Sequence, residues 1–124
     1  MIELLSYEDA LVLIDELGFV LVDPGLLSSA VARPAASFGG VDAYPDLFGK
    51  VAALLHSVAR NHALIDGNKR TAWAMARVTL LLNGYRLMAD DLEGEDFMVE
   101  VAQDHLSLDE IAKWMRDRSD EVGA

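Results

Sequence analysis

The sequence has no cysteine, which excludes disulfide bonds and metal sites built on thiolates. It is also poor in basic residues, with 10 lysine and arginine residues against 21 aspartate and glutamate residues and a formal net charge of −11. Affinity for nucleic acid depends largely on clustered lysine and arginine side chains. The composition therefore argues against a protein that binds nucleic acid directly.

Long uninterrupted apolar runs are absent as well. Arg77, Thr79 and Asn83 interrupt the longest apolar stretches, so no segment of about 20 apolar residues is available to cross a membrane. The first residues carry no basic region followed by a long apolar one, so we expect no signal peptide. These absences predict a soluble, cytoplasmic protein with no membrane partner.

The sequence does contain a large apolar fraction, 52% of 124 residues, which suits one domain over residues 1–124 with a core that needs no disulfides. Apolar residues recur at helical spacing along most of the chain. We therefore predict an all-α fold, a compact bundle of about six helices, which begin after Ser6, at Pro24, after Pro45, near Gly67, after Asp90 and after Ser107.

Two details follow from the same patterns. Lys50 lies off the apolar stripe of the helix that follows Pro45, so we expect its side chain to face away from the core. The residues from Ser119 onward are polar, so we expect the tail to fray.

Residues 34–45 form a polar break between helical segments. Gly39 and Gly40 stand between short apolar pieces, where they can turn a small hairpin. The alternative is an ordinary surface loop, and composition alone favours that alternative.

The stretch from residue 61 to residue 72 concentrates polar chemistry between two strongly helical segments. One helix ends near His62 and the next begins near Gly67, so the loop lies at a helix N-terminus, where free N–H groups attract anions. Gly67 lets a ligand approach the backbone, Asn68 adds an amide, and Lys69 and Arg70 add two positive charges. This combination predicts an anion pocket, most plausibly for phosphates.

Asp66 does not suit a bare phosphate pocket, because a carboxylate repels phosphate. It fits if Mg²⁺ lies between them, since this ion is commonly held by one or two carboxylates together with substrate phosphates. An imidazole such as that of His62 can accept a proton near neutral pH. Base, metal carboxylate and phosphate cradle together suit the transfer of a phosphorus-centred group to a hydroxyl.

Two other interpretations remain open from the residues alone. Asp66 can simply cap the helix that follows, with Asn68 and Arg70 serving the loop and His62 capping the carbonyls of the preceding helix. His62 and Asp66 can also be two ligands of a transition metal, although no third ligand is evident. His56 and His105 suit structural roles better than catalytic ones.

At these residues the sequence resembles the Fic/Doc family, whose motif reads His-x-Phe-x-Asp/Glu-Gly/Ala-Asn-Gly/Lys-Arg. The matching stretch is His62-Ala63-Leu64-Ile65-Asp66-Gly67-Asn68-Lys69-Arg70. The resemblance covers roughly residues 23–86, and its Doc-like upstream features are Gly25-Leu26-Leu27, Ala32-Arg33-Pro34, Phe38-Gly39-Gly40 and Tyr44-Pro45-Asp46-Leu47-Phe48.

The resemblance implies a Fic fold with defined roles for these residues. His62 would be the general base, Asp66 the Mg²⁺ partner, and the phosphate contacts would come from Gly67, Asn68, Lys69 and Arg70. Residues 36–44, with Phe38, Gly39 and Gly40 at their centre, would form a flap hairpin that docks the target as an added strand.

Within the family, the resemblance favours the Doc branch. That branch implies a Doc-type toxin, an ATP- and Mg²⁺-dependent protein kinase that phosphorylates a hydroxyl of translation elongation factor Tu, arrests translation and is inhibited by a Phd-type antitoxin. Lys69 replaces the glycine, and Trp73 the second arginine, that adenylylating members carry. No Ser/Thr-x-x-x-Glu inhibitory helix is evident, so inhibition would come from a separate partner. The alternatives are a Fic-type adenylyltransferase and a catalytically idle module that binds a nucleotide or a partner.

Leu64 stands where the motif has phenylalanine, and we expect this apolar side chain to pack inward. Ala63 stands where many members have proline, which would loosen the loop. Arg77 lies one helical turn beyond Trp73, too far to take over the missing arginine's contact.

Overall fold

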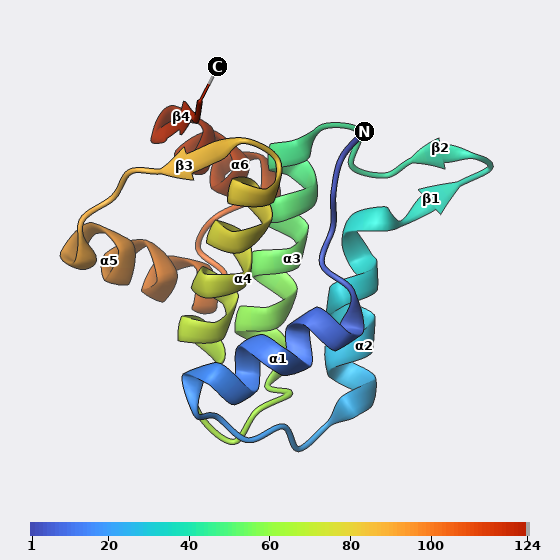
Figure 1. The fold of residues 1–124 in the computed structure, drawn as a ribbon, viewed down its shortest axis with the longest axis vertical. Helices are drawn as coiled ribbons and strands as arrows, with labels where there is room; N and C mark the ends of the chain where they lie inside the picture. The colour runs from blue at the N-terminus through green and yellow to red at the C-terminus, as the bar shows by residue number, and fades with distance from the viewer. Residues whose placement is uncertain (124) are drawn as a thin grey trace.

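The computed structural model describes residues 1–123. Its six α-helices are α1 (Tyr7–Leu17), α2 (Pro24–Ala32), α3 (Leu47–Asn61), α4 (Asn68–Leu82), α5 (Asp91–Ala102) and α6 (Leu108–Asp117), as Figure 1 shows. A short 3₁₀ helix, η1, spans Arg33–Ala35, and two small antiparallel pairs join β1 (Ser37–Phe38) to β2 (Val41–Asp42) and β3 (Tyr85–Leu87) to β4 (Ser119–Glu121). The predicted helical bundle is confirmed. Among the described residues, no helix is both long and apolar enough to span a membrane.

The helices begin where the sequence offers a capping side chain. Ser6 and Ser107 each form a capping box, with Asp9 and Glu110 as the reciprocal partners. Aspartate caps the other three predicted starts outside the central motif, at Asp23, Asp46 and Asp90. These local signals explain why the predicted and observed helix starts agree.

The core is centred on α3 and α4, which stand side by side in the middle of the bundle (Figure 1). Ala52 and Ala53 of α3 and Ala72 and Ala76 of α4 are almost completely buried. Such small side chains let two helix backbones approach closely. In Figure 1, α1 and α2 lie at the end of the pair where α3 connects to α4, and α5 and α6 lie on another side. That connection is the loop of residues 62–67.

The expectation that Lys50 faces away from the core is wrong. Its side chain is buried, and its Nζ donates to the Pro34 carbonyl at 3.2 Å and lies 3.3 Å from Oδ2 of Asp42. The segment that follows α2 folds back over α3 and supplies these partners. Helical periodicity along α3 contains no information about that long-range contact.

The expectation of a frayed tail is also wrong, because residues 119–121 form β4. This strand pairs with β3 in the register Tyr85↔Glu121, Arg86↔Asp120 and Leu87↔Ser119. The extended residues after α4 therefore have a partner from the end of the chain, which local polarity does not reveal.

Residues 37–42 form a hairpin rather than the plain loop that composition favoured. Ser37 pairs with Asp42 and Phe38 with Val41, and Gly39 and Gly40 have φ of +57° and +81°. Positive φ at both central residues is what a two-residue type I′ turn requires. The hairpin projects away from the helices in Figure 1, and Phe38 at its tip is 79% exposed. The hairpin that the family resemblance implied is thus observed, and its role in docking a target stays a prediction.

Arg33 holds the foot of this hairpin against α3. Its guanidinium donates to the Tyr44 hydroxyl at 3.1 Å and to the Ser57 hydroxyl at 2.8 Å, and lies 3.1 Å from Nδ1 of His56. The other His56 nitrogen is 3.0 Å from Asp104, and this hydrogen bond lowers the pKa of the Asp104 carboxyl below its usual value. His56 therefore has structural partners on both ring nitrogens.

Candidate active site

The loop of residues 62–67 turns the chain sharply between α3 and α4. His62 ends α3 in the left-handed conformation, with φ 55° and ψ 43°, and its side chain is exposed. A non-glycine residue at positive φ is uncommon and directs the following residues away from the helix axis. His62 thus marks the edge of the loop, with its imidazole open to solvent.

A second segment of the chain fixes the path of this loop. The backbone N–H groups of Val22 and Asp23 both donate to the Ala63 carbonyl, at 2.9 and 3.0 Å, and Ile65 N donates to the Val20 carbonyl at 3.2 Å. Leu64 packs inward at 4% exposure, as expected for its place in the motif. The backbone of residues 20–23 therefore makes the loop part of a rigid scaffold despite the alanine at position 63.

Asn68 closes the loop from the other side. Its Oδ1 accepts from Leu64 N and its Nδ2 donates to the Leu64 carbonyl, both at 3.1 Å. This pair of bonds uses one of the two amide hydrogens and leaves the other for a ligand. From the sequence, Asn68 can act as a loop brace or as a phosphate donor. The brace is observed, and the phosphate contact stays a prediction.

The N-terminus of α4 offers unpaired donors. Gly67 precedes the helix at φ +81°, and no side chain caps it. Thr71 N is the first amide of the helix to find a backbone acceptor, the Gly67 carbonyl at 2.9 Å, so the N–H groups of residues 68–70 lack partners within residues 1–123. The exposed side chains of Lys69 and Arg70 also make no ion pair there, although the protein is strongly acidic. This geometry suits an anion.

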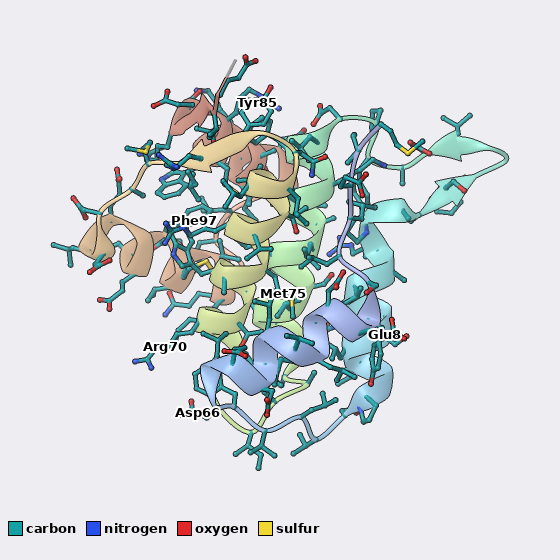
Figure 2. All side chains as sticks on the ribbon, in the orientation of Figure 1. Glu8, Asp66, Arg70, Met75, Tyr85 and Phe97 are labelled. Carbon is teal, nitrogen blue, oxygen red and sulfur yellow. The ribbon has the colours of Figure 1, made fainter. Side chains whose placement is uncertain are left out.

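These groups surround a hollow of about 500 Å³. Its polar lining comes from the motif. Its apolar walls come from Phe19, from Ile65 of the motif and from two alanines, Ala59 of α3 and Ala102 of α5. Arg60 fixes the α5 wall by donating to the Ala102 carbonyl at 2.8 Å. Figure 2 shows that Asp66 and Arg70 lie at the same end of the bundle. No local pattern in the sequence points to Phe19 or Ala102, because both reach the hollow from distant parts of the chain.

Asp66 can contribute one carboxylate oxygen to a cation. Its Oδ1 accepts from Gly67 N at 2.8 Å, whereas Oδ2 has no hydrogen bond within residues 1–123. No group of three histidine, cysteine, aspartate or glutamate residues in that part of the chain could hold a metal ion. A transition-metal site on His62 and Asp66 thus gains no third ligand. Mg²⁺, which takes remaining ligands from phosphates and water, suits a single carboxylate better.

Gly67 is constrained by a neighbour as well as by its backbone. A Cβ at this position would lie 2.4 Å from ring atoms of Phe19. Gly18 has the same left-handed backbone conformation, with φ +80°, but has no atom within 4 Å of an added Cβ. Substitutions at Gly67 and at Gly18 therefore separate the energetic cost of positive φ from the cost of a collision with Phe19.

We predict that Gly67→Ala lowers the free energy of unfolding more than Gly18→Ala does. The Gly18 change should cost about 1 kcal/mol from backbone conformation alone. The Gly67 change should cost about 1–3 kcal/mol more, because overpacking displaces Phe19 or the loop. Urea denaturation of both variants measures the difference, and Phe19→Ala added to Gly67→Ala should recover part of it. Equal losses in the free energy of unfolding of Gly67→Ala and Gly18→Ala would show that the Phe19 side chain moves aside at no cost.

Comparison with known proteins finds relatives over the part of the chain that carries this site. Residues 6–80 match the model of the Fic/DOC family. Over 92 residues the chain is 61% identical to Toxin Doc of Mycolicibacterium smegmatis, covering 73% of this chain and 71% of that protein. Over 94 residues it is 33% identical to the protein kinase doc of Escherichia phage P1, covering 76% and 73% of the two chains.

Proposed function

Since the chain belongs to the Fic/DOC family, we propose that it is a Doc-type toxin that uses ATP and Mg²⁺ to phosphorylate translation elongation factor Tu and thereby arrests translation. The relative from phage P1 is named a protein kinase, which supports phosphoryl transfer as the reaction type. The protein substrate, the nucleotide and the metal are part of the proposal.

The environment of Trp73 is the observation that supports phosphoryl transfer over adenylyl transfer. Trp73 occupies the position at which adenylylating members place a second phosphate-binding arginine. Its indole packs edge-on against Phe97 and Trp114, with ring centroids 6.2 and 6.1 Å away. An aromatic side chain in such a cluster offers no positive charge to a phosphate. Lys69, where those members have glycine, occupies space next to the same anion site.

Three groups of residues have separate roles in the proposed reaction: phosphate binding, proton transfer and metal binding. The free N–H groups at the start of α4, with Lys69 and Arg70, bind and orient the phosphates. His62 accepts the proton of the target hydroxyl as its oxygen bonds to the γ-phosphorus, and the bond from that phosphorus to the bridging β–γ oxygen breaks to release ADP. Asp66 would hold Mg²⁺, which neutralises phosphate charge when bound.

The hairpin β1–β2 is the proposed docking site for the target segment. Its four strand residues are exposed, and it forms a ribbon of only two strands, so both outer edges are open to a third. An extended target segment would pair with such an edge by backbone hydrogen bonds. Because the hairpin and the loop of residues 62–67 lie at opposite ends of α3 (Figure 1), the target would extend along the bundle to bring its hydroxyl to His62. Inhibition by a Phd-type antitoxin completes the proposal, and the relative named Toxin Doc supports it.

The test is transfer of label to purified elongation factor Tu in the presence of Mg²⁺, in parallel reactions with ATP labelled at the γ- or the α-phosphate. We expect label from the γ position only. Label from the α position would mean adenylyl transfer and would overturn the argument from Lys69 and Trp73. No label in either reaction would contradict elongation factor Tu as the target.

A further inference from the structure

The loop that begins at His62 pairs with the connection between α1 and α2. Leu21 and Leu64 form an antiparallel bridge, and Figure 1 shows the two connections at the same end of the bundle. The hydrogen bond from Ile65 N to the Val20 carbonyl, at 3.2 Å, continues this pairing. The two segments thus form a short ribbon directly after the proposed base.

Side chains alternate between the two faces of such a ribbon. Leu21 and Leu64 point inward, since Leu64 is buried and Leu21 packs against the core. Val20, Val22 and Ile65 point outward, with exposed fractions of 57%, 52% and 71%. Val20 lies opposite Ile65 and on the same face as Val22, so these three side chains form one contiguous apolar patch.

This apolar patch borders the hollow that contains the proposed base. Ile65 lines the hollow together with His62, whose imidazole is exposed. Val22 N donates to the Ala63 carbonyl at 2.9 Å, so the backbone of the patch has a fixed position next to His62. A hydroxyl that gives its proton to His62 must come within about 3 Å of the imidazole. The protein segment that carries this hydroxyl therefore covers the patch.

Nothing in the ribbon itself requires apolar side chains at these positions, because its hydrogen bonds use only main-chain groups. Exposed apolar residues are common when they are scattered, but a contiguous apolar patch indicates a contact surface. The charged side chains near His62 come instead from Asp66 and from Lys69 and Arg70 at the start of α4. The base thus has charged neighbours that suit phosphates and apolar neighbours that suit another kind of ligand.

We propose that the patch of Val20, Val22 and Ile65 binds the hydroxyl-bearing segment of the protein substrate and selects a hydroxyl whose neighbours in sequence are apolar. This inference rests on the proposed function and deepens it. The hairpin β1–β2 lies at the other end of α3, so a contact there does not position the hydroxyl at His62. Apolar side chains of the substrate that leave water against the patch supply the missing contact.

The first test makes the patch polar without changing the main-chain hydrogen bonds. The double variant Val20→Thr/Ile65→Thr keeps both side chains β-branched. Val12→Thr is the matched control, an exposed valine of α1 outside the lining of the hollow. With γ-labelled ATP, the double variant should raise the KM for elongation factor Tu about tenfold and leave the Kd for ATP within about twofold. The control should change neither value. A KM within about twofold of the wild type, or an equal rise in the control, would overturn the proposal.

The second test measures selectivity with two peptides, each with one threonine, flanked on both sides by valine in one peptide and by asparagine in the other. The wild type should phosphorylate the valine peptide with a kcat/KM about tenfold higher. The double variant should reduce this preference to within about twofold, whereas damage to the loop alone would lower both rates and keep their ratio.

Three further results would count against the inference. Equal use of the two peptides by the wild type would overturn it, and γ-phosphate transfer to elongation factor Tu in the same preparation would leave the proposed function standing. If the wild type labels neither peptide and not elongation factor Tu, both the inference and the proposed function fail. A wild-type dimer in sedimentation that the double variant loses would assign the patch to a second copy of this chain and would also overturn the inference.

Discussion

Replacing His62 with alanine should lower the rate of phosphoryl transfer to elongation factor Tu by about 10²- to 10⁴-fold, the usual contribution of a positioned general base. His62 is exposed at the edge of the site and lies outside the hydrogen-bond network that fixes the loop, which involves the backbone of its neighbours. The loss should therefore appear in kcat, with stability and the Kd for ATP nearly unchanged. Transfer of γ-phosphate label measures the first quantity, and thermal unfolding and calorimetry measure the other two.

His105→Ala is the matched control. His105 is also exposed, and the carboxylate of Glu100, 3.0 Å from its Nδ1, is its one hydrogen-bond partner within residues 1–123. This variant should transfer phosphate at the wild-type rate. A His62→Ala variant that arrests growth as well as the wild type would favour the idle binding module, because arrest would then require no chemistry.

The sequence predicts those parts of the site that depend on contiguous residues. The spacing from His62 to Arg70 places His62, Asp66 and Gly67 in the loop between two helices and Lys69 and Arg70 in the first turn of α4. The capping residues Asp23 and Asp46 define where α2 and α3 begin. These predictions succeed because hydrogen bonds over three or four residues determine the local backbone.

The parts that the sequence does not predict depend on contacts between distant residues. Lys50 appears as a surface residue in a helical pattern, but α3 places it under the hairpin, where Pro34 and Asp42 satisfy its ammonium group. Phe19 is an ordinary apolar residue in the sequence, but in the fold its ring leaves no room for a Cβ at Gly67. Composition likewise cannot distinguish a hairpin from a loop at Gly39 and Gly40, because the difference lies in backbone angles.

Asp66→Asn should lower the rate of phosphoryl transfer by about 10²- to 10³-fold, because a bound metal ion supplies several kcal/mol of charge stabilisation. The substitution is conservative in structure. The asparagine oxygen can still accept from Gly67 N, as Asp66 Oδ1 does at 2.8 Å, so the loop should keep its conformation and the protein its stability. Rates measured over a series of Mg²⁺ concentrations should show a higher requirement for the ion.

Measurements of ligand binding without turnover distinguish a role of Asp66 as a metal ligand from a role as a loop brace. If Asp66 holds Mg²⁺ against the phosphates, Asp66→Asn should weaken ATP binding when Mg²⁺ is present. When Mg²⁺ is absent, the same change should strengthen the binding of inorganic triphosphate, because it removes a negative charge that repels phosphate. Asp96→Asn makes the same change in net charge on the exposed face of α5 and should alter neither value. If Asp66 only braces the loop, the substitution should not change affinity in opposite directions with and without Mg²⁺, since the hydrogen bond to Gly67 N does not depend on the metal. Calorimetry under the two conditions therefore decides whether the carboxylate in this anion site is there for a cation.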